Sequence, residues 1–181
     1  MTSPEPSSIV LIGPMGAGKT SVGKRVAKRL GRTFHDTDAM VVRAHGAIAE
    51  LFATQGEPRF RELERDAVEE ALSRGGVVSL GGGAVLDETT RERLRAHRVA
   101  LLTVAPRVVA RRLGEAASRP LLSAGDETPI QRWERIYAER RPLYESVADA
   151  TFDTSSGPLE NIVTAIADWA EPAADIPGVT P

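Results

Sequence analysis

Cysteine is absent from the sequence, which excludes disulfide bonds, thiolate zinc sites and cysteine nucleophiles. Aromatic residues make up only 4% of the chain and the net charge is −2, so we expect no nucleic-acid partner. No apolar run approaches the roughly 18 residues that a membrane span requires. The first residues, MTSPEPSS, lack the charged and apolar regions of a signal peptide, so we expect a cytoplasmic protein with no membrane partner.

The chain is long enough to bury one full hydrophobic core. Its 181 residues are 41% hydrophobic and 27% charged, a composition typical of a globular protein, and the length favours a single domain over 1–181. The two ends, 1–8 and 171–181, are polar and rich in proline. We therefore expect both ends to fray from a core that spans about residues 9–169.

Short apolar, β-branched runs alternate with longer segments of helical period. We expect strands at 9–13, 33–37, 77–80, 99–104 and 150–154. We expect helices at 19–30, 38–44, 48–54, 57–73, 88–96, 107–113, 130–147 and 159–170. The pattern predicts an α/β fold, in which helices flank a five-stranded parallel sheet. A stretch rich in Gly, Ala, Ser and Pro, at about 114–127, is expected to form a mobile surface loop.

Residues 13–20, GPMGAGKT, satisfy the phosphate-loop pattern G-x-x-x-x-G-K-[ST]. Glycines let successive backbone N–H groups point at an anion, and the following helix directs its positive dipole end there. Lys19 can reach the β and γ phosphates of a nucleotide, and the Thr20 hydroxyl can ligate Mg²⁺. The nucleotide contacts are expected from Gly16, Ala17, Gly18, Lys19, Thr20 and Ser21. The motif indicates a nucleoside triphosphate with magnesium, but GTPase switches, ATPase motors and small-molecule kinases all share it.

Two aspartates of the segment FHDTD follow the second predicted strand. Alternation along a strand would place Asp36 and Asp38 on one face, at the sheet edge where ligands bind. One carboxylate could support magnesium through water, and the other could accept the proton of an attacking hydroxyl. The alternative is that Asp38 only caps the following helix.

A glycine run and several arginines are further candidates for a ligand site. The third strand leads into Gly81, Gly82 and Gly83, which either offer N–H groups to a compact ligand or form only a flexible turn. Arg61 and Glu64 are separated by three residues, and this spacing alone favours an ordinary surface pair. The remaining arginines of interest, natural partners of carboxylates and phosphates, are Arg111, Arg112, Arg119, Arg140 and Arg141.

The motifs GAGKTS, DTD, FRELE, SLGGGAV, RPLL and R-x-PLY, in this order, resemble the shikimate kinase family over about residues 9–169. The resemblance implies a P-loop NTPase fold similar to that of nucleoside monophosphate kinases. It also implies an ATP-dependent phosphotransferase that phosphorylates the 3-hydroxyl of shikimate, a step of chorismate and aromatic amino acid biosynthesis. The implied cofactors are ATP and Mg²⁺, the implied partner is shikimate, and we expect the chain to act as a monomer.

On the nucleotide side, the resemblance implies that Lys19 steadies the transferred phosphate and that Thr20 ligates magnesium directly. Asp36 would support the metal through water. The loop at about 114–127 would act as a mobile lid, whose Arg119 would swing in to neutralise phosphate charge, and Arg112 would contact adenine. The loop after the last strand, DTSSGP, departs from the family because it offers serines where a basic residue is frequent.

On the acceptor side, the resemblance implies that Asp38 binds and polarises the shikimate hydroxyl. Arg61 and Arg140 would bind the shikimate carboxylate, assisted by the glycine run through the Gly82 amide. Arg141 would remain in solvent. Two other functions stay open: a kinase for another hydroxy acid such as gluconate, and a non-catalytic switch protein that binds ATP.

Overall fold

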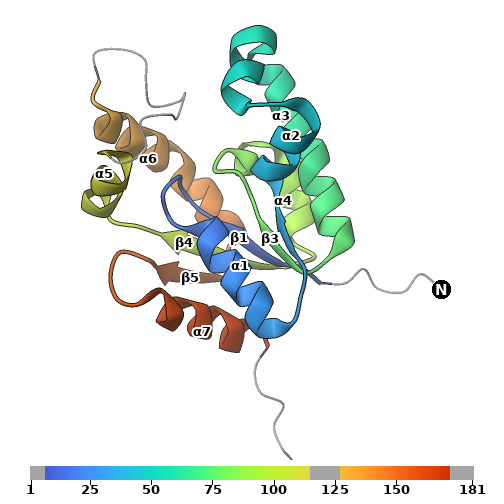
Figure 1. Ribbon diagram of the computed structural model, residues 1–181, viewed down its shortest axis with the longest axis vertical. Helices are drawn as coiled ribbons and strands as arrows, with labels where there is room; N and C mark the ends of the chain where they lie inside the picture. The colour runs from blue at the N-terminus through green and yellow to red at the C-terminus, as the bar shows by residue number, and fades with distance from the viewer. Residues whose placement is uncertain (1–6, 115–126, 172–181) are drawn as a thin grey trace, which may run out of the picture.

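The computed structural model describes residues 7–114 and 127–171. Within these residues one five-stranded parallel sheet has the order β2-β3-β1-β4-β5 (Figure 1). Its strands are β1 (Ile9–Ile12), β2 (Phe34–Asp36), β3 (Val77–Ser79), β4 (Arg98–Thr103) and β5 (Ala150–Asp153). The prediction of an α/β fold with five parallel strands is confirmed. The predicted lid with Arg119, and nearly all residues expected to fray, lie outside the described residues.

Seven helices and one short 3₁₀ turn connect these strands within the described part of the chain. They are α1 (Lys19–Leu30), α2 (Thr37–His45), α3 (Ile48–Arg74), η1 (Ala84–Leu86), α4 (Glu88–Leu94), α5 (Pro106–Gly114), α6 (Pro129–Val147) and α7 (Leu159–Ala170). The two helices predicted at 48–54 and 57–73 meet at a kink in α3, where Gly56 has a φ of 79°. Glycine adopts this left-handed conformation without steric cost, so it permits the change of direction.

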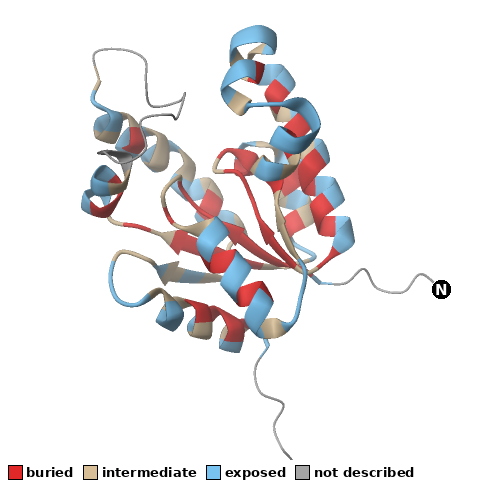
Figure 2. Cartoon of the chain, in the orientation of Figure 1, coloured by how far each residue is buried: buried red, intermediate tan, exposed pale blue. Residues whose placement is uncertain are grey.

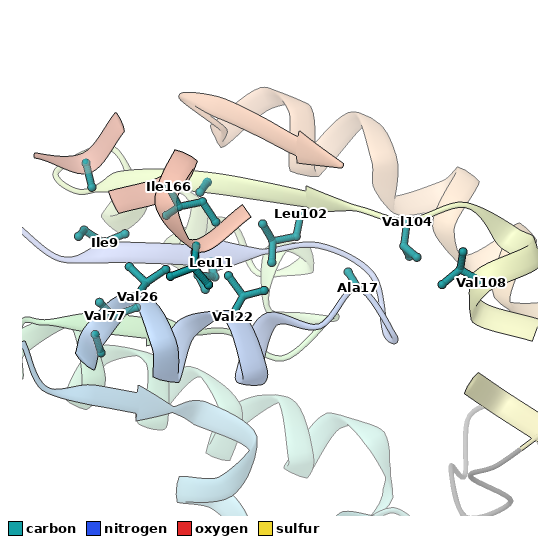
Figure 3. Close-up of a cluster of buried hydrophobic side chains, with 14 of the residues drawn as sticks. Ile9, Leu11, Ala17, Val22, Val26, Val77, Leu102, Val104, Val108 and Ile166 are labelled. Atoms are coloured by element: carbon teal, nitrogen blue, oxygen red, sulfur yellow. The ribbon is translucent and has the colours of Figure 1, made fainter. Parts of the chain in front are cut away.

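The core consists of two layers because side chains of each strand alternate between the faces of the sheet. Ile9 and Leu11 of β1 pack with α1 and α7 (Figure 3). Val10 and Ile12 face the other way, into a cluster with α3, η1 and α4. All four side chains are at most 1% exposed. The continuous apolar run of β1 therefore reflects a parallel strand that is covered on both faces.

The helical pair formed by α2 and the first half of α3 stands away from the sheet. Figure 1 shows this pair on one side of the loop after β1, with α5 and α6 on the other side. Its outer surface is largely exposed (Figure 2), and a small apolar cluster joins it to the second half of α3. That cluster contains Val41, Leu51, Phe60, Leu63 and Ala67. Among the described helices, none has the length and apolar character needed to cross a membrane.

Candidate active site

A cleft of about 850 Å³ opens where the phosphate loop, the end of β2 and the glycine run meet α2, α3, α5 and α6. Twelve of the residues singled out from the sequence line it. They are Gly16, Gly18, Lys19, Thr20, Ser21, Asp36, Asp38, Arg61, Gly82, Gly83, Arg112 and Arg140. Ala17 and Gly81 do not line the cleft, since both are buried behind its surface. Arg119 lies outside the described residues.

The phosphate loop has a backbone path that only glycine permits. Gly13 has a φ of 138°, and a Cβ atom there would lie 2.2 Å from the Leu102 carbonyl oxygen. Gly18, with a φ of 85°, is the N-cap of α1. Lys19 donates from Nζ to the carbonyl oxygens of Gly13 and Pro14, at 2.8 and 3.1 Å. The glycines therefore shape the loop, and its lysine lies over it.

Side chains from distant parts of the chain fix the outer side of the phosphate loop. Trp133 of α6 donates from Nε1 to the Met15 carbonyl oxygen at 2.8 Å, and Arg112 of α5 donates to the Gly16 carbonyl oxygen. The Met15 and Gly16 carbonyl groups are thus held by these two donors. A fixed backbone suits a loop whose N–H groups are to bind an anion.

Asp36 and Asp38 both line the cleft, but not through strand alternation. β2 ends at Asp36, whose side chain caps α2 by accepting from the Ala39 N–H at 3.1 Å. Asp38 lies in the first turn of α2. The strand prediction for Asp38 was therefore wrong, and so was the alternative that Asp38 is the cap, because Asp36 takes that position.

The residue between the two aspartates anchors the glycine run. Thr37 is fully buried, and its Oγ1 accepts from the Gly81 N–H at 3.0 Å. A Cβ atom on Gly81 would lie 2.5 Å from Asp38 Oδ1 and 2.6 Å from Glu64 Oε1. The interpretation of the run as a flexible turn is wrong, since its backbone is hydrogen-bonded and packed against two carboxylates.

Arg61 and Glu64 form an ion pair, but the pair is not the exposed surface pair that the spacing favoured, because Glu64 is buried. Arg61 Nη1 lies 2.7 Å from Glu64 Oε2, and the Glu64 side chain is only 4% exposed. Burial raises the pKa of Glu64, and the positive charge of Arg61 opposes this shift. The negative charge of Asp38 raises the same pKa further, and the positive charge of Arg140 lowers it. Two arginines and two carboxylates therefore meet at one end of the cleft.

Three residues of the site were given no functional role from the sequence: Glu64, Trp133 and Tyr144. Tyr144 is 1% exposed and donates from Oη to the Gly82 carbonyl oxygen at 2.5 Å. It follows Arg140 by four residues on α6, a helical spacing that was a usable signal. Arg141, in contrast, is paired with Glu145 at 2.7 Å with its side chain 61% exposed, in agreement with the prediction that it stays in solvent.

The chemistry of the donor set suits magnesium delivered with a nucleotide. Among the described residues, no group of three or more His, Cys, Asp or Glu side chains could hold a metal ion. Mg²⁺ needs few protein ligands, because waters and phosphate oxygens fill most of its coordination sphere. Thr20 and Asp36 provide two oxygens beside the phosphate loop, with Thr20 Oγ1 donating to Asp36 Oδ2 at 2.6 Å.

Known proteins are similar to this chain over most of its length. A family model described as shikimate kinase matches residues 15–171. The shikimate kinase of Streptomyces coelicolor is 44% identical over 165 residues, which are 90% of this chain and 95% of that protein. The one of Thermobifida fusca is 45% identical over 168 residues, 92% of this chain and 96% of that protein.

Solved structures agree with the sequence relatives. A structure described as shikimate kinase from Acinetobacter baumannii in complex with shikimate superposes with a TM-score of 0.84 at 35% identity, covering 92% of this chain and 93% of that one. A gluconokinase from Sinorhizobium meliloti 1021 reaches 0.60 at 23% identity, covering 93% of this chain and 95% of that one, and this likeness shows the fold alone. The chain belongs to the shikimate kinase family.

Proposed function

We propose that this chain transfers the γ-phosphate of ATP to the 3-hydroxyl of shikimate, producing shikimate 3-phosphate and ADP. One observation carries the proposal: a single cleft joins a phosphate loop to a cluster of two arginines and two carboxylates. The relatives named shikimate kinase, and the one solved with shikimate, support the choice of acceptor. We place the reaction in the synthesis of chorismate and the aromatic amino acids.

At the phosphate end of the cleft, the chain supplies positive charge and a fixed position. Lys19 binds the transferring phosphate, whose transition state spreads negative charge over its oxygens. Thr20 would hold Mg²⁺ directly and Asp36 through water; the bound ion supplies further charge to the phosphate oxygens. Arg112, which lies over the phosphate loop, contacts the base, and Arg119 contributes to phosphate neutralisation.

At the acceptor end, the carboxylate and the reacting hydroxyl are bound by different groups. Arg61 and Arg140 bind the shikimate carboxylate, assisted by backbone N–H groups of the glycine run around Gly82. Asp38 accepts a hydrogen bond from the hydroxyl, orients it towards the phosphate and polarises it. The two arginines attract the carboxylate of shikimate, and this attraction determines which end of the ring faces the phosphate loop.

The alternatives account less well for this acceptor end. The gluconokinase structure reported above is 23% identical, and this likeness supports the fold and not the choice of gluconate as acceptor. A non-catalytic switch protein has no need for Arg61, Arg140 and Asp38 beside the phosphate loop, yet all three line the cleft. We also propose that the enzyme acts in the cytoplasm and as a monomer; in support of a monomer, described residues of this one chain line both ends of the cleft.

The test is ADP release from Mg·ATP with shikimate, with gluconate and with no acceptor, using the Asp38→Ala protein as the control. We expect ADP release that depends on shikimate and is lost in the variant. Release that depends on gluconate alone would instead identify the other kinase. Tight ATP binding with no release for either acceptor would favour the switch function.

A further inference from the structure

The hydroxyl of Tyr144 joins α6 to the glycine run that the proposed function assigns to the acceptor carboxylate. Tyr144 Oη donates to the Gly82 carbonyl oxygen at 2.5 Å. A hydroxyl has one proton, and here that proton is given to Gly82. Arg140 lies four positions earlier on the same helix, near enough for its positive charge to act on the Tyr144 hydroxyl.

The direction of this hydrogen bond does not change with pH in the ordinary range. Burial raises the pKa of Tyr144 to about 12, although the positive charge of Arg140 opposes the shift. The residue is only 1% exposed, so its hydroxyl is largely shielded from solvent. Tyr144 therefore remains a donor to Gly82.

A hydrogen bond to the Gly82 carbonyl also orients the next N–H group. The carbonyl of Gly82 and the N–H of Gly83 belong to one planar peptide unit and point in opposite directions. On the other side of the run, Thr37 Oγ1 accepts from the Gly81 N–H at 3.0 Å. Glycine has little conformational preference of its own, so these two side chains determine where the N–H groups of the run point.

We propose that Tyr144 is a positioning residue for the acceptor carboxylate: its hydroxyl holds the Gly82–Gly83 peptide against α6, the helix that carries Arg140. The inference rests on the proposed function, because it assumes that the glycine run and Arg140 bind the carboxylate of shikimate. It adds a residue that acts through the glycine run and sets the spacing between that run and α6. Such spacing matters because a charge-assisted contact weakens steeply when its geometry is lost.

The first test is steady-state kinetics of the Tyr144→Phe enzyme with Mg·ATP and shikimate. We expect the KM for shikimate to rise about tenfold, while kcat and the KM for ATP change less than about twofold. Tyr137→Phe is the matched control, because Tyr137 is the chain's other tyrosine, lies on the same helix, and its hydroxyl has no hydrogen bond among the described residues. An unchanged KM for shikimate in Tyr144→Phe would overturn the inference.

A second acceptor separates positioning from a general structural role. The shikimate analogue with its carboxylate reduced to an alcohol should be a poor substrate for the wild-type enzyme, and Tyr144→Phe should add less than about a twofold change to it. An equal loss on both acceptors would mean that Tyr144 only supports the fold. If the wild-type enzyme does not phosphorylate shikimate at all, the proposed function is wrong. That outcome is read from the wild type alone, so it is distinct from a failure of the inference, which is read from the variants.

Should Tyr144→Phe fail to fold, 3,5-difluorotyrosine at position 144 keeps the ring and the hydroxyl but lowers the phenol pKa. In that protein the KM for shikimate should rise at alkaline pH, where the fluorinated phenol can no longer donate. The wild-type enzyme should keep its lower KM at the same pH. Superimposable pH profiles for the two proteins would contradict the positioning role.

Discussion

At the scale of single residues, two carboxylates converge on the same glycine but have different surroundings. A Cβ atom at Gly81 would lie 2.5 Å from Asp38 Oδ1 and 2.6 Å from Glu64 Oε1. Asp38 lines the cleft from the first turn of α2. Glu64 is 3% exposed and has a raised pKa caused by burial. We therefore assign the reaction to Asp38 and the support of Arg61 to Glu64.

The Asp38→Asn variant tests the role in the reaction. The amide keeps the size of the side chain but removes the charge and the proton acceptor, so we expect kcat to fall by about 10²–10⁴-fold. Binding of Mg·ATP, measured by calorimetry, should not change. Asp66→Asn is the control, because Asp66 is exposed on α3 outside the cleft. Turnover near the wild-type value in Asp38→Asn would show that another group polarises the hydroxyl.

Glu64 predicts a specific pH dependence of stability. Its pKa is raised in the folded state, so the folded protein binds this proton more tightly than the unfolded chain does. The contribution to the unfolding free energy is then fully present below 4.5, the ordinary pKa of glutamate, and is lost as the pH rises through the folded-state pKa. Glu64→Gln removes this titration.

The measurement is urea unfolding of the wild-type and Glu64→Gln proteins across that range. We expect the unfolding free energy of the wild type, relative to the variant, to decrease as the pH rises and then to level off. Glu62→Gln is the matched control, since Glu62 is exposed on the same helix. A relative stability that increases with pH would mean that the attraction of Arg61 outweighs burial.

At the scale of elements, the glycine run after β3 is packed unequally along its length. A Cβ atom at Gly81 would overlap two carboxylates, whereas one at Gly82 would have its nearest neighbours at 3.6 Å, an ordinary contact distance. Gly81→Ala should therefore lower the unfolding free energy by about 1–3 kcal/mol. Gly82→Ala should change it by less than about 0.5 kcal/mol. Thermal and urea unfolding of both variants would reveal the difference, and equal losses would contradict it.

The elements themselves could be predicted because their signals are local. α1 and α7 begin and end at the predicted residues, and Gly31 closes α1 with a φ of 64°, a conformation suited to glycine. The kink at Gly56 was also visible in the sequence, since it separates two predicted helices. The end of β2 was not, because an aspartate can extend a strand or cap a helix, and only the hydrogen bond of Asp36 to Ala39 decides.

The site could be predicted only in part for a related reason. The phosphate loop and the arginines belong to contiguous motifs, so their residue types and spacing identify them. The burial of Glu64 depends on the packing of α3 against the glycine run, which spacing along one helix cannot show. The hydrogen bond from Tyr144 to Gly82 joins residues 62 positions apart. It forms only because the fold brings α6 next to the glycine run that follows β3.

At the scale of the whole molecule, the cleft has two chemically different ends built on different elements. The phosphate end is formed by the loop after β1 and the end of β2, and the acceptor end by α3, α6 and the glycine run. Each substrate should therefore stabilise the fold through its own contacts. Arg140 and Arg141 allow this to be tested, because they are adjacent on α6 but only Arg140 lines the cleft.

We expect Mg·ATP and shikimate, each at about 100 times its Kd, to stabilise the wild-type protein by about 2.7 kcal/mol and to raise its Tm by about 5–11 °C. Arg140→Ala should keep the shift with Mg·ATP and lose most of the shift with shikimate. Arg141→Ala should keep both shifts, since that side chain is 61% exposed and paired with Glu145. Loss of both shifts in Arg140→Ala would mean that the two ends of the cleft do not bind their ligands independently. A wild-type protein that is stabilised by Mg·ATP but not by shikimate would remove the support for a shikimate site.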